Sequence, residues 1–137
     1  MLIDNLLERL ERIHYRGVWV MAEKKLEVGG MNFRVFDERQ DLPVLFLHGF
    51  PDSSYVWRKQ IPALTAAGYR TIVPDLRGFG ESARPEGVEN YTAKLLLGDI
   101  IGILDDLEIS KPHVIGHDWA PCWRGFSPAF PLIELKA

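Results

Sequence analysis

Two segments near the start of the chain alternate between apolar and polar residues, which is the pattern of a half-buried β-strand. They run from Lys24 to Val28 and from Met31 to Phe36, and Gly29-Gly30 separates them. A Gly-Gly connection between alternating segments is typical of a β-hairpin, because glycine readily takes the positive φ angles of such turns. The sequence therefore predicts an antiparallel hairpin over residues 24–36.

Three further segments are predicted strands, and the first of them, a continuous apolar run, is typical of a strand that is covered on both faces in a parallel sheet. They are residues 43–47, 69–73 and 112–116, and segments with helical spacing separate them. A strand–helix–strand–helix–strand series with short connections forms a parallel sheet with right-handed crossovers. We therefore expect an α/β architecture, in which a β-hairpin is followed by a βαβαβ parallel sheet with helices on both faces.

The two connecting helices are predicted from apolar residues that recur every three or four positions. The first is expected to have an N-cap at Ser53 or Ser54, a local irregularity at Pro62, an end at Gly68, and an apolar face of Trp57, Ile61 and Leu64. The second is expected to begin at a Thr92 cap and to bury Leu96, Ile100, Ile103, Leu104 and Leu107.

The first 20 residues form a separate extension in this interpretation. Residues 2–13 place apolar side chains on one helical stripe with charges opposite, and we favour a surface helix over a partner-binding or membrane-surface helix. Translation could also begin at Met21, just before the first predicted strand. The main unit is residues 21–119, and residues 120–137 are a tail of different character.

Composition and charge exclude several classes of function. Hydrophobic residues make up 47% and charged residues 26% of the 137 residues, as in ordinary globular proteins, and the net charge is −3. This charge gives no electrostatic reason to expect nucleic acid or an anionic membrane as a partner. The single cysteine, Cys122, and the charged N-terminus predict a cytoplasmic protein without disulfides or a signal peptide. The histidines lack metal-ligand spacing, so no metal is expected.

The candidate chemistry lies where the last predicted strand ends. Gly116-His117-Asp118-Trp119-Ala120 has the form of a nucleophile elbow, a sharp strand-to-helix turn, with aspartate as the nucleophile and Ala120 where glycine is usual. Small residues flank such a nucleophile because the strained turn leaves little room for side chains.

Three motifs, each at the end of a predicted strand, together carry a family resemblance. Taken in order, they resemble the N-terminal half of an α/β-hydrolase-fold epoxide hydrolase, over roughly residues 24–119. The motifs are His48-Gly49-Phe50-Pro51, Asp75-Leu76-Arg77-Gly78-Phe79-Gly80 and Gly116-His117-Asp118-Trp119. The resemblance implies an α/β-hydrolase fold of which this chain holds the N-terminal portion only, truncated after the elbow.

The resemblance also implies roles for individual residues. Asp118 would be the nucleophile, and the backbone N–H groups of Phe50 and Trp119 would form the oxyanion hole. The residues implied to shape the site are His48, Gly49, Pro51 and His117. An aspartate is already ionised at neutral pH, so it can open a small apolar epoxide without a base and without a cofactor. Water that a histidine deprotonates would then hydrolyse the aspartyl ester to a diol.

A haloalkane dehalogenase is the nearest alternative, because that family resembles this pattern up to and including the Asp-Trp pair. Many of those enzymes hold the halide with a second side-chain donor after His-Gly, where this chain has Phe50. Phenylalanine has no donor, so we favour the epoxide hydrolase. Fluoroacetate-type dehalogenases fit less well, because Trp119 stands where they carry an arginine.

The tail lacks the residues that would complete an active site of this family. In the epoxide hydrolase family the catalytic histidine, its acidic partner and the lid with its tyrosines follow the elbow. Residues 120–137 contain no His or Tyr and one acid, Glu134. We therefore expect the chain to be inactive alone, and a non-catalytic remnant is a third interpretation. The oligomeric state stays open.

The composition of the tail suggests its origin. Pro121, Gly125, Pro128 and Pro131 forbid the long helix that the family has here. Shifting the reading frame just after the Trp119 codon restores a glycine and an apolar helix, which favours a frameshift over retained intron sequence. We also expect the Val114-Ile115 strand to be an exposed sheet edge, so that the isolated chain is poorly stable or prone to associate.

Overall fold

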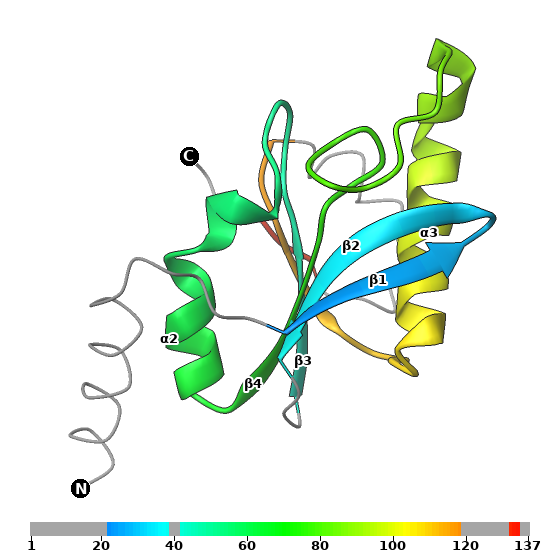
Figure 1. Ribbon diagram of the computed structural model, residues 1–137. Coiled ribbons are helices and arrows are strands. Elements are labelled where there is room, and N and C mark those ends of the chain that lie inside the picture. The colour runs from blue at the N-terminus through cyan, green and yellow to red at the C-terminus, as the bar shows by residue number, and fades with distance from the viewer. Residues whose placement is uncertain (1–21, 39–41, 119–131, 135–137) are drawn as a thin grey trace, which may run out of the picture.

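The computed structural model describes residues 22–38 and 42–118, and the backbone of residues 132–134. The predicted helix at 2–13, Trp119 and most of the tail lie outside these residues. The strands described form one sheet in the order β1-β2-β4-β3-β5-β6. Helices α2 and α3 lie on opposite sides of this sheet (Figure 1), so the predicted three-layer α/β arrangement is confirmed.

The N-terminal hairpin is confirmed with its predicted turn. Strands β1 (Glu23–Val28) and β2 (Met31–Glu38) are antiparallel, and Val28 lies opposite Met31. Gly29 and Gly30 have φ angles of 57° and 77°. Two consecutive residues with positive φ give the turn whose twist matches that of the two strands, and glycine adopts these angles without strain.

The parallel part of the sheet is also confirmed. Strand β3 (Leu42–Leu47) pairs in parallel with β4 (Tyr69–Pro74) on one side and with β5 (His113–Gly116) on the other. Strand β2 joins the far side of β4 in antiparallel orientation. The carboxyl ends of β3, β4 and β5 therefore lie along the same edge, and the loops that follow these strands emerge together.

Alternate residues of β3 belong to two different hydrophobic cores. Leu45 and Leu47 pack on the side of α3, whereas Val44 and Phe46 pack on the other side with Trp57. This alternation explains why the strand is continuously apolar, because successive side chains of a strand point to opposite faces. The two cores hold β3 rigidly and so fix the position of the loop that follows it.

The prediction of one helix through Trp57, Ile61 and Leu64 is wrong in detail. A 3-10 turn, η1 (Ser54–Trp57), is capped by the side chain of Ser53, and the separate helix α2 (Gln60–Ala66) follows. Pro62 explains the division, because it has no N–H to donate to the carbonyl of residue 58 and is tolerated only in the first turn of a helix.

The second helix has its predicted start and its predicted buried face. A short 3-10 turn, η2 (Val88–Tyr91), precedes α3 (Ala93–Asp106), and the Thr92 side chain accepts a hydrogen bond from the Leu95 N–H. The buried apolar residues are Leu96, Ile100, Ile103, Leu104 and Leu107. Neither described helix is long and apolar enough to cross a bilayer.

The expectation that β5 is an exposed sheet edge is wrong. Strand β6 (Leu132–Glu134) pairs with β5 in parallel, with Val114 opposite Leu132 and Gly116 opposite Glu134. Unpaired N–H and C=O groups of an apolar strand are costly, and even a strand of three residues can satisfy them. Among the described strands, β5 is therefore an interior strand, with β3 on one side and β6 on the other.

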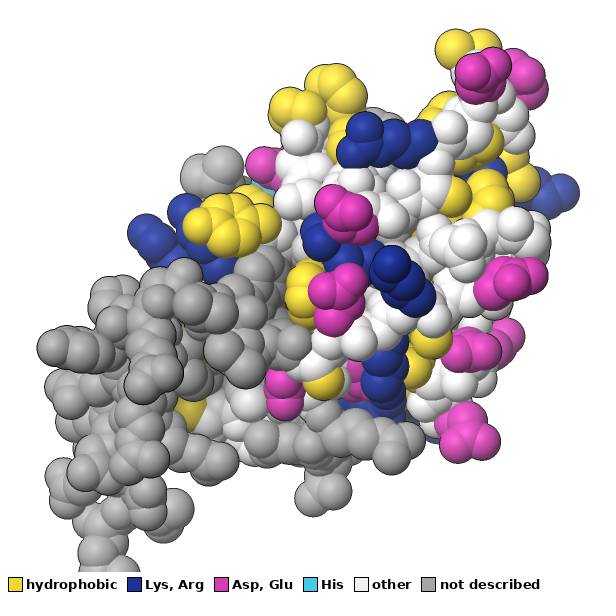
Figure 2. All heavy atoms as spheres, in the orientation of Figure 1, with side chains coloured by type: hydrophobic (Ala, Val, Ile, Leu, Met, Phe, Trp, Pro, Cys, Tyr) yellow, Lys and Arg dark blue, Asp and Glu magenta, His cyan; other side chains and the backbone are white. Residues whose placement is uncertain are grey.

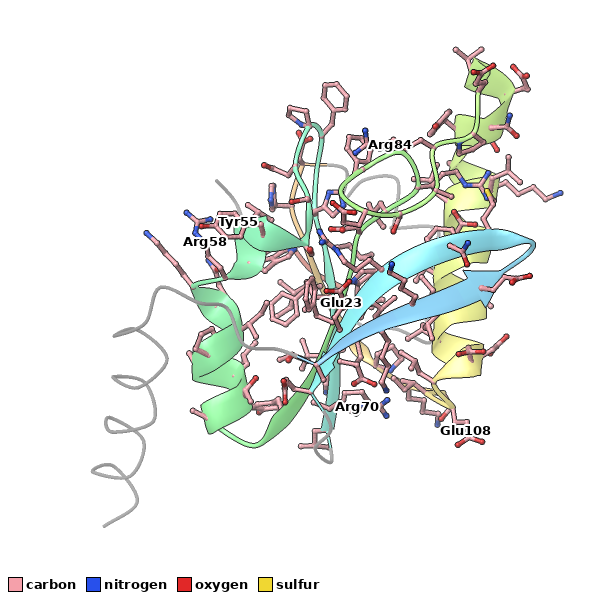
Figure 3. All side chains as sticks on the ribbon, viewed as in Figure 1. Glu23, Tyr55, Arg58, Arg70, Arg84 and Glu108 are labelled. Carbon is pink, nitrogen blue, oxygen red and sulfur yellow. The ribbon has the colours of Figure 1, made fainter. Side chains whose placement is uncertain are left out.

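A buried carboxylate links strands β1, β2 and β4 near the start of β4. The Asp37 carboxylate of β2 accepts hydrogen bonds from Lys24 Nζ of β1 at 2.7 Å and from Arg70 of β4 at 2.9 Å. Arg70 is labelled at the lower end of the sheet in Figure 3, and Arg84 marks the upper end. Burial alone would raise the pKa of Asp37, but the hydrogen bonds and charges of Arg70 and Lys24 lower it.

Candidate active site

The predicted nucleophile and one predicted oxyanion-hole amide lie in direct contact. Leu47 of β3 pairs with Gly116 of β5, so the residues that follow the two strands leave the sheet side by side. The Phe50 N–H donates a hydrogen bond of 3.1 Å to Asp118 Oδ2. These two residues are 68 positions apart in the sequence, and only the parallel pairing of β3 with β5 brings them together.

The backbone at Asp118 has the geometry of a sharp turn. Its φ angle is 62°, in the left-handed region, where aspartate and asparagine are the non-glycine residues most readily accommodated. The side chain is exposed at the edge of the sheet. A strained turn that leaves a carboxylate exposed at the end of a buried strand is the arrangement expected of a nucleophile elbow.

Glycine is required at position 49 because Asp118 approaches it closely. A Cβ atom at Gly49 would lie 2.6 Å from Asp118 Cβ and 2.9 Å from Asp118 Oδ2. Any side chain there would push the carboxylate away from the Phe50 amide. The absence of a side chain at Gly49 therefore allows the close approach of Asp118 to the Phe50 amide.

His48 links the loop after β3 to the loop after β4. Its ring is fully buried, with Nδ1 2.9 Å from the Gly49 carbonyl oxygen and Nε2 3.0 Å from the Leu76 amide nitrogen. Phe79 packs edge-on against the ring at a centroid distance of 5.4 Å. Burial lowers the pKa of His48 below its usual value and so favours the neutral ring.

Asp75 organises the second loop from a fully buried position. Its carboxylate accepts hydrogen bonds from the backbone N–H groups of Ser54 and Glu81, at 2.8 and 3.0 Å, and from Arg34 Nε at 2.7 Å. Burial acts to raise the pKa of Asp75, but these hydrogen bonds, led by those of Ser54, together with the Arg34 charge lower it below the usual value. Asp75 is thus an ionised anchor for three separate segments.

A second buried ion pair ties the same loop to α3. Arg77 donates to both carboxylate oxygens of Asp99, at 2.8 and 2.6 Å, and its Nη1 donates to the Asn90 carbonyl. Sequence reasoning did not identify Asp99 or Arg34. The signal at Asp99 is its place on the buried face of α3, between Leu96 and Ile100, because a charge at such a position requires a buried partner.

His117 contacts the segment that follows β3. The His117 ring packs edge-on against Trp57 at 5.2 Å, and its Nε2 is 4.0 Å from an oxygen of Asp52. The peptide bond between Phe50 and Pro51 is cis. Trp57 is buried, so it belongs to the core and not to a substrate wall.

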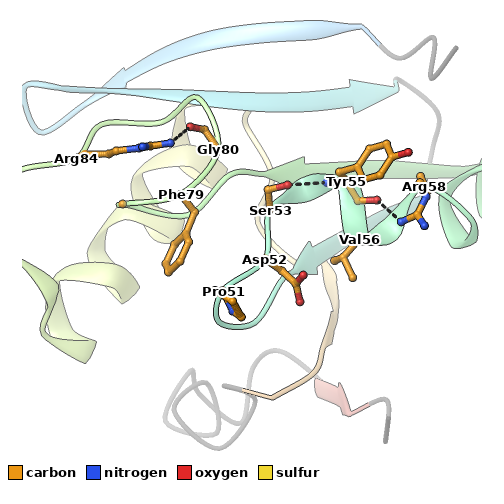
Figure 4. A pocket seen from close by; sticks show the side chains of 10 residues that line it. Pro51, Asp52, Ser53, Tyr55, Val56, Arg58, Phe79, Gly80 and Arg84 are labelled. Atoms are coloured by element: carbon orange, nitrogen blue, oxygen red, sulfur yellow. Dashed lines mark hydrogen bonds between the residues drawn. The ribbon is translucent and has the colours of Figure 1, made fainter.

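An open pocket of about 470 Å³ lies beside these residues, between the loop after β3 and the turn at residues 78–80 (Figure 4). Its rim includes Arg58 and Arg84, and its walls include Pro51 and Phe79. Asp118 does not line it. The pocket therefore lies next to the candidate site but does not contain the carboxylate.

Asp118 and Phe50, whose amide contacts it, are both exposed. Phe50 exposes 61% of its surface and packs edge-on against Phe79 at 5.9 Å. In the described part of the face shown in Figure 2, acidic and basic side chains are interspersed. No group of three potential metal ligands occurs among the described residues, and the amide of Trp119 lies outside them.

The comparison with protein families and curated proteins gives consistent results. A family model described as alpha/beta hydrolase fold matches residues 43–120. An epoxide hydrolase of Caballeronia sordidicola is 45% identical over 99 residues, which are 72% of this chain and 30% of that protein. Epoxide hydrolase A of Mycobacterium tuberculosis is 43% identical over 72% of this chain and 31% of its own length. The chain thus spans about a third of these relatives.

Solved structures show the same similarity in three dimensions. Epoxide hydrolase A from Mycobacterium thermoresistibile superposes with a TM-score of 0.78 at 39% identity, over 85% of this chain and 39% of that one. An epoxide hydrolase from Vigna radiata superposes with a TM-score of 0.79 at 36% identity, over 85% of this chain and 40% of that one.

Proposed function

This chain belongs to the α/β-hydrolase fold family, and on that premise we propose that it carries the nucleophile and oxyanion loop of an epoxide hydrolase. One observation carries the proposal. The Asp118 carboxylate, on a backbone with φ of 62°, lies 3.1 Å from the Phe50 amide at the carboxyl edge of the sheet. The names of its relatives support the choice of epoxides as substrates.

In the proposed reaction, Asp118 attacks one carbon of the epoxide ring. The carbon–oxygen bond of the ring breaks, the ring oxygen takes a proton from solvent water, and an ester of Asp118 forms. Water then attacks the ester carbonyl, and the resulting oxyanion is held by the Phe50 and Trp119 amides. Collapse of this intermediate releases a diol and returns the free carboxylate.

The described residues include the proposed nucleophile for ester formation, but the base for ester hydrolysis is a separate question. Hydrolysis of the ester needs a base that takes a proton from water. His48 cannot act as this base, because both of its ring nitrogens are engaged within the fold. We therefore propose that hydrolysis needs a base other than His48, and that the chain alone forms the ester without turning over.

The surroundings of the carboxylate favour a small apolar epoxide. Phe50, whose N–H donates to Asp118, exposes most of its side chain and packs edge-on against Phe79. The Phe50 side chain has no hydrogen-bond donor for a departing halide, which is the feature that separates this site from a dehalogenase of the type described above. On the composition of the chain, we propose a cytoplasmic setting.

Covalent trapping tests the proposal without requiring turnover. The protein is incubated with styrene oxide, and peptide mapping by mass spectrometry locates the added mass. We expect modification at Asp118, lost in Asp118→Asn and retained in Asp52→Asn, a matched control that removes a neighbouring carboxylate outside the proposed chemistry. Modification of Cys122 or surface residues alone, unchanged in Asp118→Asn, would contradict the proposal.

A further inference from the structure

We propose that His48 is a positioning residue that orients and polarises the Gly49–Phe50 peptide group, whose N–H faces the Asp118 carboxylate. The inference rests on the proposed function only in taking this amide as part of the oxyanion hole. It assigns to His48 a role in the hydrogen-bonding strength of that amide, beyond shaping the loop.

The hydrogen bonds of the His48 ring define which of its two nitrogens carries the proton. The Leu76 backbone N–H can only donate, so His48 Nε2, 3.0 Å from the Leu76 nitrogen, carries the lone pair. A neutral imidazole has one proton, which is then on Nδ1. Nδ1 lies 2.9 Å from the Gly49 carbonyl oxygen and donates to it. Burial of the ring favours this neutral state.

The Gly49 carbonyl and the Phe50 N–H are the two ends of one peptide group. The carbonyl accepts from His48 Nδ1 and also from the Asp52 N–H at 3.0 Å. The N–H of the same peptide group donates to Asp118 Oδ2 at 3.1 Å. Hydrogen bonds in a chain polarise one another, so donation to the carbonyl strengthens the N–H as a donor to the site.

The far end of this chain of hydrogen bonds is firmly held. Leu76 follows Asp75, whose buried carboxylate accepts from Ser54, Glu81 and Arg34. The order of the chain is therefore Leu76 N–H, His48 ring, Gly49–Phe50 peptide and Asp118 carboxylate. An immobile anchor at one end fixes the direction of the amide at the other, which is the preorganisation that an oxyanion hole requires.

Two substitutions separate the two hydrogen bonds of the ring. In His48→Asn the amide nitrogen is bonded to Cγ, as Nδ1 is, so the donor to Gly49 is kept and the acceptor for Leu76 is lost. In His48→Gln the side-chain oxygen lies one bond further out, near the position of Nε2 in histidine. The acceptor for Leu76 is therefore kept and the donor to Gly49 is lost. Each variant is the matched control for the other.

Nuclear magnetic resonance of the full chain measures both bonds residue by residue. In His48→Gln we expect the Phe50 amide proton to move upfield while Leu76 stays protected from hydrogen exchange. In His48→Asn we expect the reverse: an unchanged Phe50 shift, with Leu76 exchanging roughly fivefold to tenfold faster. A merely structural role would change both amides together in both variants, and that result would overturn the proposal.

The wild-type protein gives a test that does not depend on the folding of any variant. Imidazole nitrogen shifts should show His48 protonated on Nδ1 and not on Nε2, and the opposite tautomer would overturn the proposal. None of these measurements requires a reaction. Absence of epoxide labelling at Asp118, combined with the expected tautomer and exchange pattern, would refute the proposed function and leave the role of His48 standing.

Discussion

Two aspartates follow the two strands that flank β3 at the same edge of the sheet, yet their environments are opposite. Asp75 follows β4, is fully buried, and accepts from the backbone of two segments and from Arg34. Asp118 follows β5, is exposed, and receives one donor from the described residues, the Phe50 N–H. The first carboxylate has its oxygens occupied by the fold, and the second keeps oxygen lone pairs available for chemistry.

This difference shows that one sheet edge holds both a buried anchor and an exposed carboxylate, the latter being the group that we propose as the nucleophile. A saturated, buried carboxylate stabilises the loops around it but cannot reach an electrophile. An exposed carboxylate with one orienting donor contributes little to folding and keeps oxygen lone pairs accessible. His48 joins the two environments, because its ring connects the residue after Asp75 to the loop that faces Asp118.

The largest expected effect is a difference in stability between variants of the two aspartates. Asp75→Asn should lower the free energy of unfolding by about 3 kcal/mol, because it leaves Arg34 without its carboxylate partner and sets a donor amide against other donors. Asp118→Asn should change it by less than about 0.5 kcal/mol, since the site is exposed and asparagine tolerates positive φ. Urea denaturation followed by circular dichroism measures both. Equal losses would contradict the comparison.

Alanine substitution at the two glycines beside these carboxylates should sharpen the difference. Gly80 has φ of 53° and a new Cβ would collide with the buried Asp75 carboxylate, so Gly80→Ala should cost about 2–3 kcal/mol. Gly49→Ala meets Asp118 Cβ, which no side-chain rotation can move, so the exposed turn at Asp118 must shift, at a cost of about 1–2 kcal/mol. In contrast to Gly80→Ala, it should abolish labelling at Asp118 in a folded protein.

Gly98→Ala is the control for both glycine substitutions. A Cβ at Gly98, within α3, meets nothing within 4 Å. Alanine is the better helix former, so this variant should gain roughly 0.5–1 kcal/mol. A loss at Gly98 similar to that at Gly49 would show that the cost at Gly49 does not come from contact with Asp118.

The smallest expected effect is the pH dependence that His48 adds. Its pKa is lowered in the folded state from the ordinary value of 6.5, so the unfolded chain binds the proton more readily. Stability therefore falls as the pH drops below about 6.5 and levels off below the folded pKa. His48→Asn should reduce this slope in urea denaturation measured between about pH 7 and about pH 5. An unchanged slope would mean that His48 does not contribute.

Much of the fold was predictable because local patterns and tertiary structure agree. The hairpin, the parallel strands and the buried face of α3 follow from periodicity, glycine turns and the Thr92 cap. The helix after β3 was predicted as one piece because Trp57 and Ile61 share a spacing, but Pro62 divides it. Strand β6 was missed because three residues in a tail rich in proline give no periodic signal.

The sequence by itself determined which residues stand at the ends of the strands: His48 to Pro51 after one, Asp75 to Gly80 after the next, and Asp118 after the third. Only the tertiary structure decided how they meet. Parallel pairing of β3 with β5 and β4 places Phe50 against Asp118 and His48 against Leu76. Such contacts depend on strand order and on the direction of single hydrogen bonds, which hydrophobic periodicity does not encode.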